Sequence, residues 1–271
     1  MKFTLLMAAA TLALSPAVVS AQDLLARIKA GGVLTVGTEA RFPPFEFVEN
    51  GEIVGYSADI MTEIMSSALP GVVLKRLDLP WQGILPGLAA ERFDYVVTSV
   101  TVTPERREAY YLSVPIADAT MAVLKRADDD SISTPSDMAG HPVGSQAGSA
   151  QLAALERFAG TLDSAPDIVS YTDFSEAYAD LAARRVDAVV NSLPNLLEAA
   201  RQRPDVFAVV SPTFGDPTYF SWAGRMDEDS ASLNALFDAE LKRLIKEGTL
   251  TALQEKWFGG PMDLPTELPT K

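Results

Sequence analysis

Cysteine is absent from the 271-residue sequence, and histidine occurs once, as His141. The lack of cysteine excludes disulfide bonds, thiolate metal sites, a cysteine nucleophile and a lipid anchor attached through cysteine. His141 precedes Pro142 at the start of an expected strand, so we expect it at the surface rather than in a Ser-His-Asp set. The sequence also lacks the G-x-S-x-G, H-E-x-x-H, Walker and dinucleotide glycine motifs. The run Asp128–Asp130 is typical of a solvated turn. We therefore expect no catalytic residue, no cofactor and no metal site.

After the N-terminal segment, apolar runs of about 18 residues that could cross a membrane are lacking. Residues 1–21 combine Lys2, the apolar stretch Phe3–Leu14 and small residues up to Ala21, which is typical of a secretory signal peptide cleaved after Ala21. An exported chain without a cysteine-linked anchor is best retained in an enclosed compartment, so we expect a location in the periplasm. The formal net charge of −14 disfavours nucleic acid and anionic membrane surfaces as partners.

One sequence pattern occurs twice along the chain. Leu88–Ser99 and Leu181–Ser192 both run from a helix end through Arg and Asp into an apolar strand that ends on polar residues. The second copy begins 93 residues after the first. Helix-to-strand turns of α/β proteins often look alike, so chance similarity is the alternative explanation. We predict two lobes of related βα construction, each with a polar strand end.

Short apolar runs rich in β-branched residues alternate with amphipathic helical segments along the chain. This alternation predicts an α/β protein with mostly parallel sheets that are covered by helices on both faces. The expected strands are Val33–Val36, Val72–Leu77, Tyr95–Val97, Met121–Leu124, Val143–Ser145, Ile168–Tyr171, Ala188–Val190 and Phe207–Val210. The expected helices are Asp59–Leu69, Gln82–Ala90, Ala150–Phe158, Ser175–Arg184 and Asn195–Arg201. A long amphipathic stretch, Ser232–Trp257, precedes a tail that we expect to be loose.

The stretch Thr38–Phe47, TEARFPPFEF, places three phenylalanines around two adjacent prolines after the first expected strand. Proline lacks an N–H group and restricts the residue before it, so the stretch must be extended or turning. A loop stiffened in this way can hold aromatic rings in fixed positions. Ligands of open α/β sheets bind beyond the carboxyl ends of the strands, so we expect this loop at a ligand cleft between the two lobes.

The segment Thr98–Arg106 is the most informative for chemistry. Thr103 and Pro104 predict an N-cap followed by proline at the first helical position. Arg106 then falls in the first turn, where the helix dipole disfavours a cation by roughly 0.3–1 kcal/mol. An anion placed between the guanidinium and the positive end of the helix dipole would remove this repulsion. The planar guanidinium fork suits a carboxylate.

Other groups in this expected cleft can add hydrogen bonds to an anion. Ser99 and Thr101 alternate along the strand before Arg106 and carry hydroxyl groups. Gly144–Ala150 runs from an expected strand to a helix start, where free backbone N–H groups can form a second anion site. The alternative for Arg106 is a surface arginine paired with a glutamate of its own helix.

The N-terminal part of the chain holds three patterns in a specific order. G-x-L-x-V-G-T-E-x-x-F-P-P-F-E-F is followed by Gly51–Ile60, then by Trp81 with Leu85–Leu88, and then by T-x-T-P-E-R. This order resembles the polar amino-acid-binding proteins of ABC importers, which are periplasmic solute-binding proteins of family 3. The resemblance spans roughly residues 30–258 and implies a two-lobed Venus-flytrap fold of the periplasmic-binding-protein type.

The resemblance also implies how the chain is divided and what it does. Crossings between the lobes would fall near Asp118–Met121 and Phe214–Tyr219. One lobe would comprise residues 22–119 and 217–258, the other residues 120–216, with a C-terminal tail at 259–271. Such a protein captures a small zwitterionic ligand with a carboxylate by lobe closure. It delivers the ligand to the membrane permease of an ABC transporter, and we expect it to act as a monomer.

The family's ligand-binding positions carry over one by one. Phe42 and Trp81 match the aromatic pair that sandwiches the ligand, and Arg106 matches the arginine that clamps its α-carboxylate. Glu39 matches a position that is acidic in some members and can meet a cationic side chain. The remaining matched positions contact the ligand or cover its carboxylate, and these are Ser99, Thr101, Gly148, Ser149 and Ala150.

One position departs from the family pattern. Members that bind ordinary α-amino acids usually carry an aspartate for the ammonium group, where this sequence has Ser192, preceded by Asn191. We keep both as ligand-binding candidates, although a neutral serine cannot balance a desolvated ammonium. Either Glu39, Asp173 or Asp216 balances the charge of the ammonium, or the ligand lacks a primary ammonium. A delocalised or quaternary cation would gain from the faces of the aromatic pair.

Two other functional classes compete with the binding protein. A periplasmic enzyme on the same scaffold, such as the cyclohexadienyl-type dehydratases that resemble this family, would need an acid or base in the cleft. Glu39 leaves that option open, whereas the missing aspartate argues against it. We disfavour an extracytoplasmic sensor lobe because no spanning helix or signalling domain follows residue 258.

Overall fold

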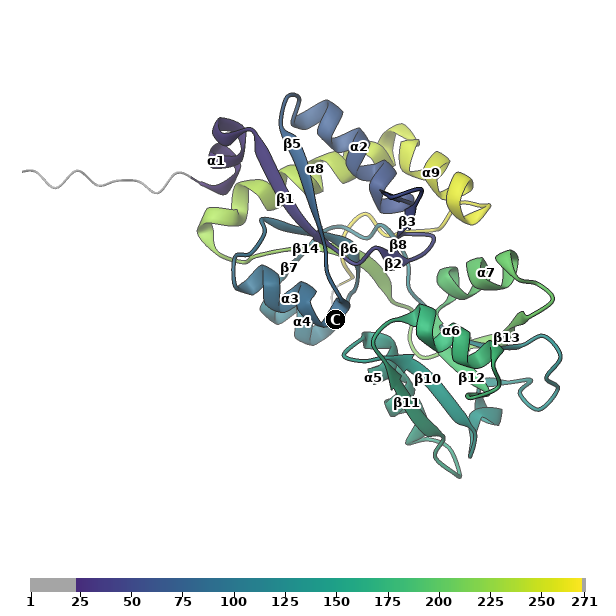
Figure 1. Ribbon diagram of the computed structural model, residues 1–271. Coiled ribbons are helices and arrows are strands. Elements are labelled where there is room, and N and C mark those ends of the chain that lie inside the picture. The colour runs from purple at the N-terminus through teal and green to yellow at the C-terminus, as the bar shows by residue number, and fades with distance from the viewer. Residues whose placement is uncertain (1–22, 270–271) are drawn as a thin grey trace, which may run out of the picture.

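The structure, a computed structural model, describes residues 23–269 and has two lobes, each built on its own β-sheet (Figure 1). The predicted signal peptide, residues 1–21, lies outside the described residues. Between residues 23 and 269, no helix combines the length and the apolar character that crossing a membrane requires. The two sheets lie at opposite ends of the molecule, and the polypeptide passes between them twice.

The first lobe contains a six-stranded sheet in the order β5-β1-β6-β14-β7, with β8 paired to β14. Its strands are β1 (Val33–Thr38), β5 (Val73–Asp78), β6 (Tyr95–Thr101), β7 (Tyr111–Leu112), β8 (Ala117–Asp118) and β14 (Tyr219–Gly224). Its helices are α1 (Leu24–Gly31), α2 (Tyr56–Ala68), α3 (Trp81–Ala89), α4 (Pro104–Ala109), α8 (Ala231–Glu247) and α9 (Thr249–Phe258), with a short 3₁₀ turn η2 (Glu228–Ser230).

The second lobe contains a five-stranded sheet in the order β11-β10-β12-β9-β13. Its strands are β9 (Met121–Arg126), β10 (Pro142–Gln146), β11 (Asp167–Tyr171), β12 (Ala188–Ser192) and β13 (Phe207–Phe214). Its helices are α5 (Ala150–Ala159), α6 (Phe174–Ala182) and α7 (Leu193–Gln202), with a 3₁₀ turn η1 (Pro135–Met138). Every strand and helix expected from the sequence is present, although several begin or end a few residues away.

The expectation of mostly parallel sheets is only partly right, because both sheets are mixed. β1 pairs in parallel with β5 and β6, and β10 pairs in parallel with β11 and β12. In contrast, β9 is antiparallel to β12 and β13, and β14 is antiparallel to β6. The cause is that β9 and β14 follow directly on the crossings between the lobes, residues 119–120 and 215–218, so both strands begin at the cleft. The parallel strands β1, β6, β10 and β12 end at the cleft, so β9 and β14 run in the opposite direction.

The loop after β1 forms a small sheet that the sequence did not predict. Its strands are β2 (Arg41–Phe42), β3 (Glu46–Glu49) and β4 (Glu52–Val54). In this sheet Phe42 lies opposite Glu46, and Arg41 lies opposite Phe47. The side chain of Glu46 is turned into the protein, with 1% of the residue exposed.

The repeated sequence pattern occupies equivalent places in the two lobes. The first copy spans the end of α3 and β6, and the second spans the end of α6 and β12. Each of these strands is third in the order of its sheet, after two parallel strands. Glu91 and Arg184, which correspond in the two copies, both adopt left-handed backbone conformations, with φ of 55° and 61°. Asp94 and Asp187 also correspond, and each donates its N–H to the carbonyl of a residue at the neighbouring strand, Thr35 or Pro142. The repeat is therefore structural and not chance similarity.

Two expectations for the C-terminal part are corrected by the structure. The stretch Ser232–Trp257 forms two helices, α8 and α9, because Gly248 takes a left-handed conformation with φ of 79° and ends α8. The tail is not loose, since Met262, Leu264 and Leu268 pack against buried clusters of the first lobe. The predicted apolar face of α8 is confirmed, and its members Leu233, Phe237, Leu241 and Leu244 are fully buried.

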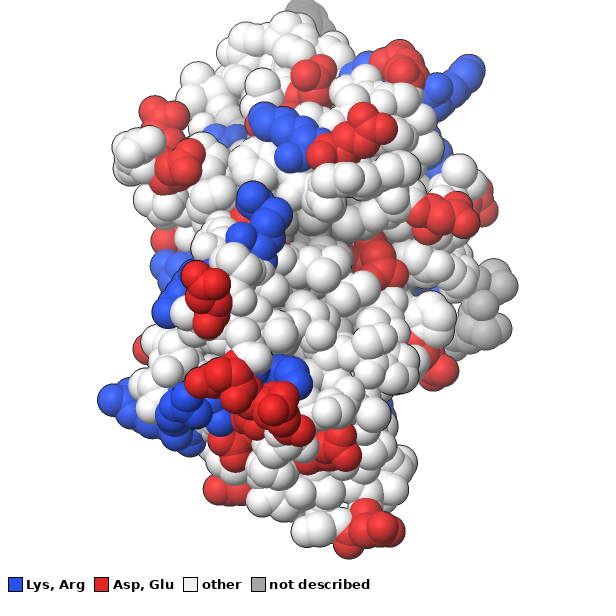
Figure 2. Space-filling model, turned by 90° about the vertical axis from the view of Figure 1, so that its right-hand side faces the viewer, with Lys and Arg blue, Asp and Glu red and all other residues white. Residues whose placement is uncertain are grey.

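Figure 2 shows the distribution of charge on one face of the molecule. Lys and Arg side chains are interspersed with Asp and Glu side chains, and neither sign covers a continuous area of this face. In the part of the chain that the structure describes, many charged side chains form ion pairs, such as Arg184 with Asp128 and Arg243 with Glu247. The acidic excess is therefore spread out rather than gathered here into one patch.

The left-handed turn of the repeat can be tested at Glu91, an exposed residue. We expect Glu91→Val to lower the free energy of unfolding by about 1–2 kcal/mol, since a β-branched residue is strained in this conformation. We expect Glu91→Gly to be neutral or stabilising because glycine has no Cβ to clash. Urea denaturation of both variants measures the difference, and equal stability of the two would contradict the assigned turn.

Candidate ligand-binding site

The candidate residues lie where the two lobes face each other, beyond the carboxyl ends of strands from both sheets. Glu39 follows β1, and Ser99 and Thr101 lie in the last part of β6. Gly148 and Ser149 follow β10, and the remaining second-lobe candidates, Asn191 and Ser192, end β12. This placement agrees with the rule that ligands of open α/β sheets bind beyond the carboxyl ends of their strands.

Arg106 is placed by the short helix α4. Thr103 caps this helix by accepting a hydrogen bond from the Arg106 N–H at 3.3 Å, and Pro104 opens it, as the sequence predicted. The Arg106 guanidinium lies over the ring of Trp81, with 4.8 Å from Cζ to the ring centroid, and its Nη1 donates to the carbonyl oxygen of Thr101 at 2.9 Å. Burial lowers its pKa to about 10. Among residues 23–269, no carboxylate forms an ion pair with this guanidinium, which leaves it suited to an anion from outside.

Trp81 joins the two lobes. Its indole Nε1 donates to the carbonyl oxygen of Gly148 at 2.9 Å, across the cleft. The neighbouring Gln82 donates through Nε2 to the carbonyl oxygens of Ala147, at 3.1 Å, and Thr172, at 3.2 Å. These bonds run from the start of α3 in the first lobe to the loops after β10 and β11 in the second. Arg106, Trp81 and Gly148 therefore form one continuous contact from lobe to lobe.

Glu39 makes a second contact between the lobes. Its Oε1 accepts a hydrogen bond from Nε2 of Gln146 at 2.5 Å, and the residue is only 3% exposed. Gln146 also donates to the carbonyl oxygen of Thr172 at 3.2 Å. Burial raises the pKa of Glu39 to about 8, and the nearby carboxyl of Glu46 acts in the same direction. A ligand cation beside Glu39 would oppose both effects and favour the carboxylate form.

Glu46 lies beneath this part of the cleft, fully buried. One of its carboxyl oxygens accepts hydrogen bonds from the hydroxyl of Thr98 and from the N–H of Ser99, the latter at 3.0 Å. The hydroxyl of Thr98 in turn accepts the N–H of Glu39 at 3.4 Å. Burial raises the pKa of Glu46 to about 7. Glu46 therefore fixes the ends of β1 and β6 relative to each other.

Phe42 packs into a cluster of aromatic rings. Its ring centroid lies 5.9 Å from that of Phe45, 5.7 Å from that of Phe174 and 5.8 Å from that of Phe220. Phe174 belongs to the second lobe, so this cluster also bridges the cleft. Among the described residues, Phe42 has no ring contact with Trp81, its expected partner in an aromatic pair. Phe45 is fully buried.

The start of α5 faces the cleft beside Trp81. Gly148 has φ of 69°, a conformation that favours glycine, and a Cβ at this position would meet no atom within 4 Å. Ser149 caps the helix, since its Oγ accepts the N–H of Leu152 at 3.0 Å, and its own N–H donates to the carbonyl oxygen of Gln146. The N–H of Ala153 bonds to the carbonyl of Ser149. Since the first four N–H groups of a helix lack intrahelical partners, those of Ala150 and Gln151 remain for an anion.

Asn191 and Ser192 are bound within the second lobe. The Nδ2 of Asn191 donates to the hydroxyl of Tyr178 at 2.8 Å, and its Oδ1 accepts the N–H of Ser192 at 2.7 Å. The hydroxyl of Ser192 accepts Nε2 of Gln151 at 3.1 Å. Both residues are fully buried. Through Gln151, Ser192 is linked to the first turn of α5, which is the side of the cleft where an anion would lie.

The other acidic candidates for a ligand cation differ in position. Asp173 caps α6 by accepting the N–H of Glu176, and it lies 3.9 Å from Nε of Arg41 across the cleft. Asp216 is exposed in the second crossing between the lobes. Glu39 is therefore the only one of the three that is both buried and directed into the contact between the lobes.

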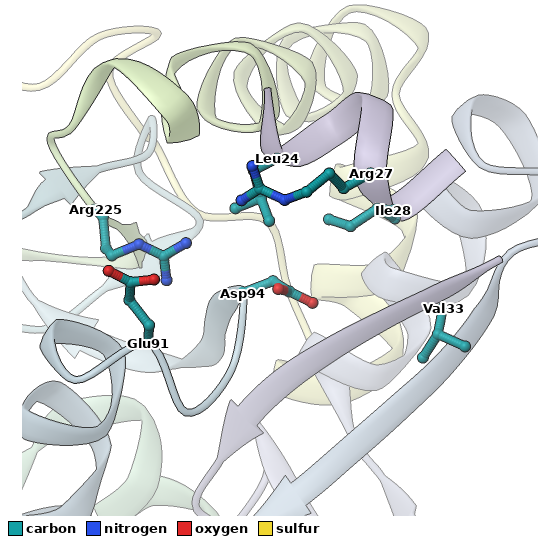
Figure 3. Close-up of a pocket in the computed structure, with 7 residues that line it drawn as sticks. All are labelled: Leu24, Arg27, Ile28, Val33, Glu91, Asp94 and Arg225. Atoms are coloured by element: carbon teal, nitrogen blue, oxygen red, sulfur yellow. The ribbon is translucent and has the colours of Figure 1, made fainter. Parts of the chain in front are cut away.

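A surface pocket elsewhere in the first lobe has different properties. It has a volume of about 210 Å³ and is lined by Arg27, Arg225, Glu91, Asp94 and three apolar residues (Figure 3). Val33, which lines it, is the first residue of β1, so the pocket lies at the amino end of this strand. Its charged groups hold the fold together: Arg225 donates to the carbonyl of Phe93, and Asp94 accepts the N–H of Thr35. We therefore place the ligand site in the cleft.

Several residues of this site were not predicted from the sequence. Gln146, Gln82 and Asn195 all bond across the cleft, and Asn195 does so by donating from Nδ2 to the carbonyl of Pro43 at 2.8 Å. Gln146 lies within the Gly144–Ala150 segment, where its place at a polar strand end was the available signal. Glu46 lay within the FPPFEF motif, but its burial depends on the small β2–β3–β4 sheet.

His141 and two aspartates of the run Asp128–Asp130 form contacts with other side chains of the second lobe. His141 is half-buried, and its Nδ1 lies 2.9 Å from Oδ2 of Asp187. In the run Asp128–Asp130, Asp129 pairs with Arg126 at 2.7 Å and Asp128 with Arg184. Among residues 23–269, no group of three or more acidic or histidine side chains gathers as a metal site would require.

The buried carboxyls predict a pH dependence of stability. The folded-state pKa of Glu39, about 8, lies above its ordinary value, so the folded protein binds this proton more tightly than the unfolded chain. Stability from this group is complete below about pH 4.5 and is lost as pH rises through about 8. We expect the free energy of unfolding of the ligand-free protein to fall by about 3 kcal/mol between pH 5.5 and 8.5.

Urea denaturation at several pH values measures this loss, and Glu39→Gln is expected to make the curve clearly flatter. The matched control is Glu156→Gln on the exposed side of α5, which should follow the wild type. A wild-type curve that stays level or rises across this range would contradict the burial of neutral carboxyls in the cleft.

Comparison with known proteins agrees with this arrangement. Residues 34–260 match the family model described as bacterial extracellular solute-binding proteins, family 3. The L-cystine-binding protein TcyJ of Escherichia coli K12 is 30% identical over 240 residues, which cover 88% of this chain and 87% of that protein.

Two solved structures are similar over nearly the whole fold. An ancestral arginine-binding protein bound to arginine has a TM-score of 0.75 and 33% sequence identity, covering 84% of this chain and 99% of that one. The ancestral amino acid-binding protein AncCDT-1, a precursor of cyclohexadienyl dehydratase, has a TM-score of 0.75 and 29% identity, covering 87% and 99%. With its two lobes, its cleft and this match, the chain belongs to the bacterial extracellular solute-binding proteins of family 3.

Proposed function

We propose that this protein is a periplasmic solute-binding protein that captures an amino acid or a related small zwitterion and delivers it to the permease of an ABC transporter. The observation that carries the proposal is the Arg106 guanidinium, which lies on Trp81 at the cleft without a carboxylate partner among residues 23–269. In this proposal the protein is a monomer without catalytic residues or cofactor. Its N-terminal signal peptide is removed on export.

The ligand carboxylate is held from both lobes in this proposal. Arg106 supplies a planar pair of donors, and the N–H groups of Ala150 and Gln151 at the start of α5 approach from the opposite side. Ser192, through Gln151, holds this helix start in place. Trp81 lies between the two groups of donors and presents its ring to the ligand. An anion here meets the second lobe only when the cleft is closed.

The positive part of the ligand meets Glu39 in this proposal. Ser192 carries no charge, and Glu39 is the buried acid that lies in the contact between the lobes. A guanidinium or another delocalised cation suits this place, since it can bond to Glu39 and stack on an aromatic face. The similarity to an ancestral arginine-binding protein supports a cationic amino acid, whose α-ammonium would then need a second acid. An opine, a betaine or a cyclic zwitterion pairs a carboxylate with a cation and lacks a primary ammonium.

Closure is proposed to turn on the two crossings. Residues 22–119 and 217–258 would move as one lobe and residues 120–216 as the other. The structure has the lobes in contact through Trp81–Gly148, Glu39–Gln146 and Pro43–Asn195. A ligand that touches both lobes adds contacts only in the closed form, and this difference in contacts is what shifts the hinge equilibrium.

The dehydratase alternative rests on one observation, the raised pKa of Glu39 in the cleft, which a general acid would need. The protein AncCDT-1 is itself an amino acid-binding protein, so similarity to it supports the binding function. Incubation of the purified protein with a cyclohexadienyl carboxylic acid separates the two: the binder leaves the acid unchanged by NMR, whereas the enzyme consumes it.

A thermal-shift screen tests the ligand class. We expect opines or cyclic or methylated zwitterions to raise the melting temperature most, because they pair a carboxylate with a cation that is not a primary ammonium. The shift should grow with concentration, by about 2.7 kcal/mol of stabilisation at 100 times Kd. If ordinary L-amino acids such as L-glutamine or L-arginine give the largest shift, the argument from Ser192 is wrong and another acid meets the ammonium. If no zwitterion shifts the melting temperature, the proposed function fails.

Variants of Arg106 test the carboxylate anchor. We expect Arg106→Ala to weaken binding of the best ligand by roughly 2–5 kcal/mol, since a buried carboxylate would lose its partner. Arg106→Lys keeps the charge but loses the planar fork, so it should also weaken binding. Calorimetric titration measures both, and Arg92→Ala, an exposed arginine of the same lobe, is the control.

Small-angle scattering completes this test. The wild type should become more compact with ligand, while Arg106→Ala should not change at the same ligand concentration. Binding and compaction by Arg106→Ala equal to those of the wild type would place the anchor elsewhere.

A further inference from the structure

The chain after α9 runs back along the first lobe toward the cleft. Met262 donates its N–H to Oε1 of Gln254 at 3.0 Å, and its sulfur accepts the N–H of Asp118 at 3.4 Å. Met262 and Leu264 pack against the main buried cluster of the lobe. Leu268 packs against the buried cluster that includes Trp81 of α3, and Pro269 bonds to Arg107 of α4. Residues 260–269 are called the strap below.

One end of the strap touches the first crossing between the lobes. Asp118 is the last residue of β8, and its carboxylate accepts the N–H and the hydroxyl of Thr120, at 3.0 and 2.8 Å. The carbonyl of Thr120 accepts the N–H of Leu193, the first residue of α7 in the second lobe. Met262 therefore contacts Asp118, whose carboxylate holds Thr120 of the crossing in place.

The other end of the strap touches the elements that carry Arg106. Leu268 packs against the buried cluster that contains Trp81 and Ile84, and so does Tyr110, which follows α4. The carbonyl of Pro269 accepts a hydrogen bond from Nη1 of Arg107, the residue after Arg106. Between these two ends, Glu267 lies 3.9 Å from Lys242, an exposed pair that contributes little.

Helix α4 needs such support. It has six residues, and none of them is buried. A helix this short is not stable without packing from outside. Trp81 supplies a contact to Arg106, and Pro269 of the strap accepts a hydrogen bond from Arg107. Leu268 packs against the same buried cluster as Tyr110, the residue that follows the helix.

We propose that the strap, residues 260–269, is a positioning element that ties helix α4 and its Arg106 to the first interlobe crossing. In this arrangement Met262 holds the crossing, and Leu268 with Pro269 holds α4 and the cluster under Trp81. The strap sets where Arg106 stands relative to the hinge before any ligand enters. The role of Arg106 as anchor rests on the proposed function, whereas the mechanical tie is a property of the free protein.

Hydrogen exchange of the free, full-length protein tests the tie residue by residue. The reporters at α4 are the N–H groups of Arg107 and Tyr110, which bond to Thr103 and Arg106. The reporter at the crossing is the N–H of Asp118. We expect Leu268→Ala to speed exchange at α4 about tenfold, equivalent to about 1.4 kcal/mol, and to leave Asp118 unchanged.

The reverse pattern is expected for Met262→Ala, which should speed exchange at Asp118 and spare α4. Leu268→Met should restore slow exchange at α4, and Glu267→Gln, in the same segment, is the matched control with no effect. A chain that ends at Gly260 should show both changes together. In all variants, exchange in the second sheet, for example at Val189, should stay at the wild-type rate.

Two results would overturn the proposal. Unchanged exchange at α4 in Leu268→Ala would mean that the strap does not hold this helix. Faster exchange at α4, at Asp118 and at Val189 together in either variant would mean that the strap adds only global stability. Neither result depends on a ligand. If no zwitterion stabilises the full-length protein, the proposed function is wrong, but the exchange experiment on the strap still applies because it uses the free protein.

Discussion

The contact from Arg106 through Trp81 to Gly148 is the interaction on which the cleft depends. It places a guanidinium, an aromatic face and a helix start from two different lobes within one short path. The guanidinium is costly to bury, and its lowered pKa reflects that cost. In the proposed function, an anion at this place would offset that cost, and lobe closure and carboxylate binding would be two aspects of one arrangement.

The acidic side of the cleft complements this basic side. Glu39 follows β1, Glu46 begins β3, and the two are linked through Thr98 of β6, so the carboxyl of Glu46 adds to the cost of ionising Glu39. Neutral carboxyls keep the empty cleft free of unbalanced negative charge. A ligand cation would draw Glu39 into its charged form, so charge would develop only when it is compensated. The cleft therefore has a guanidinium on one side and carboxyls on the other, which suits a zwitterion.

Much of this could be predicted from the sequence, because its signals are local. The strands and helices follow from apolar periodicity, the cap at Thr103–Pro104 from backbone chemistry, and the equivalent turns at Glu91 and Arg184 from the repeat. The partners of each side chain depend on long-range packing, which periodicity does not encode. For this reason Gln146 opposite Glu39, the aromatic cluster around Phe42 and the packed strap were not predicted. The direction of β9 and β14 was missed because it depends on both strands starting at the cleft, where the chain enters each lobe.

The most direct test of the central claim is a crystal structure of the protein with the zwitterion that stabilises it most. The account predicts closed lobes, with the ligand carboxylate within hydrogen-bond distance of the Arg106 guanidinium and of the N–H groups at the start of α5. It also predicts the cationic part beside Glu39. A ligand carboxylate bound away from Arg106, for example in the pocket lined by Arg27 and Arg225, would contradict it.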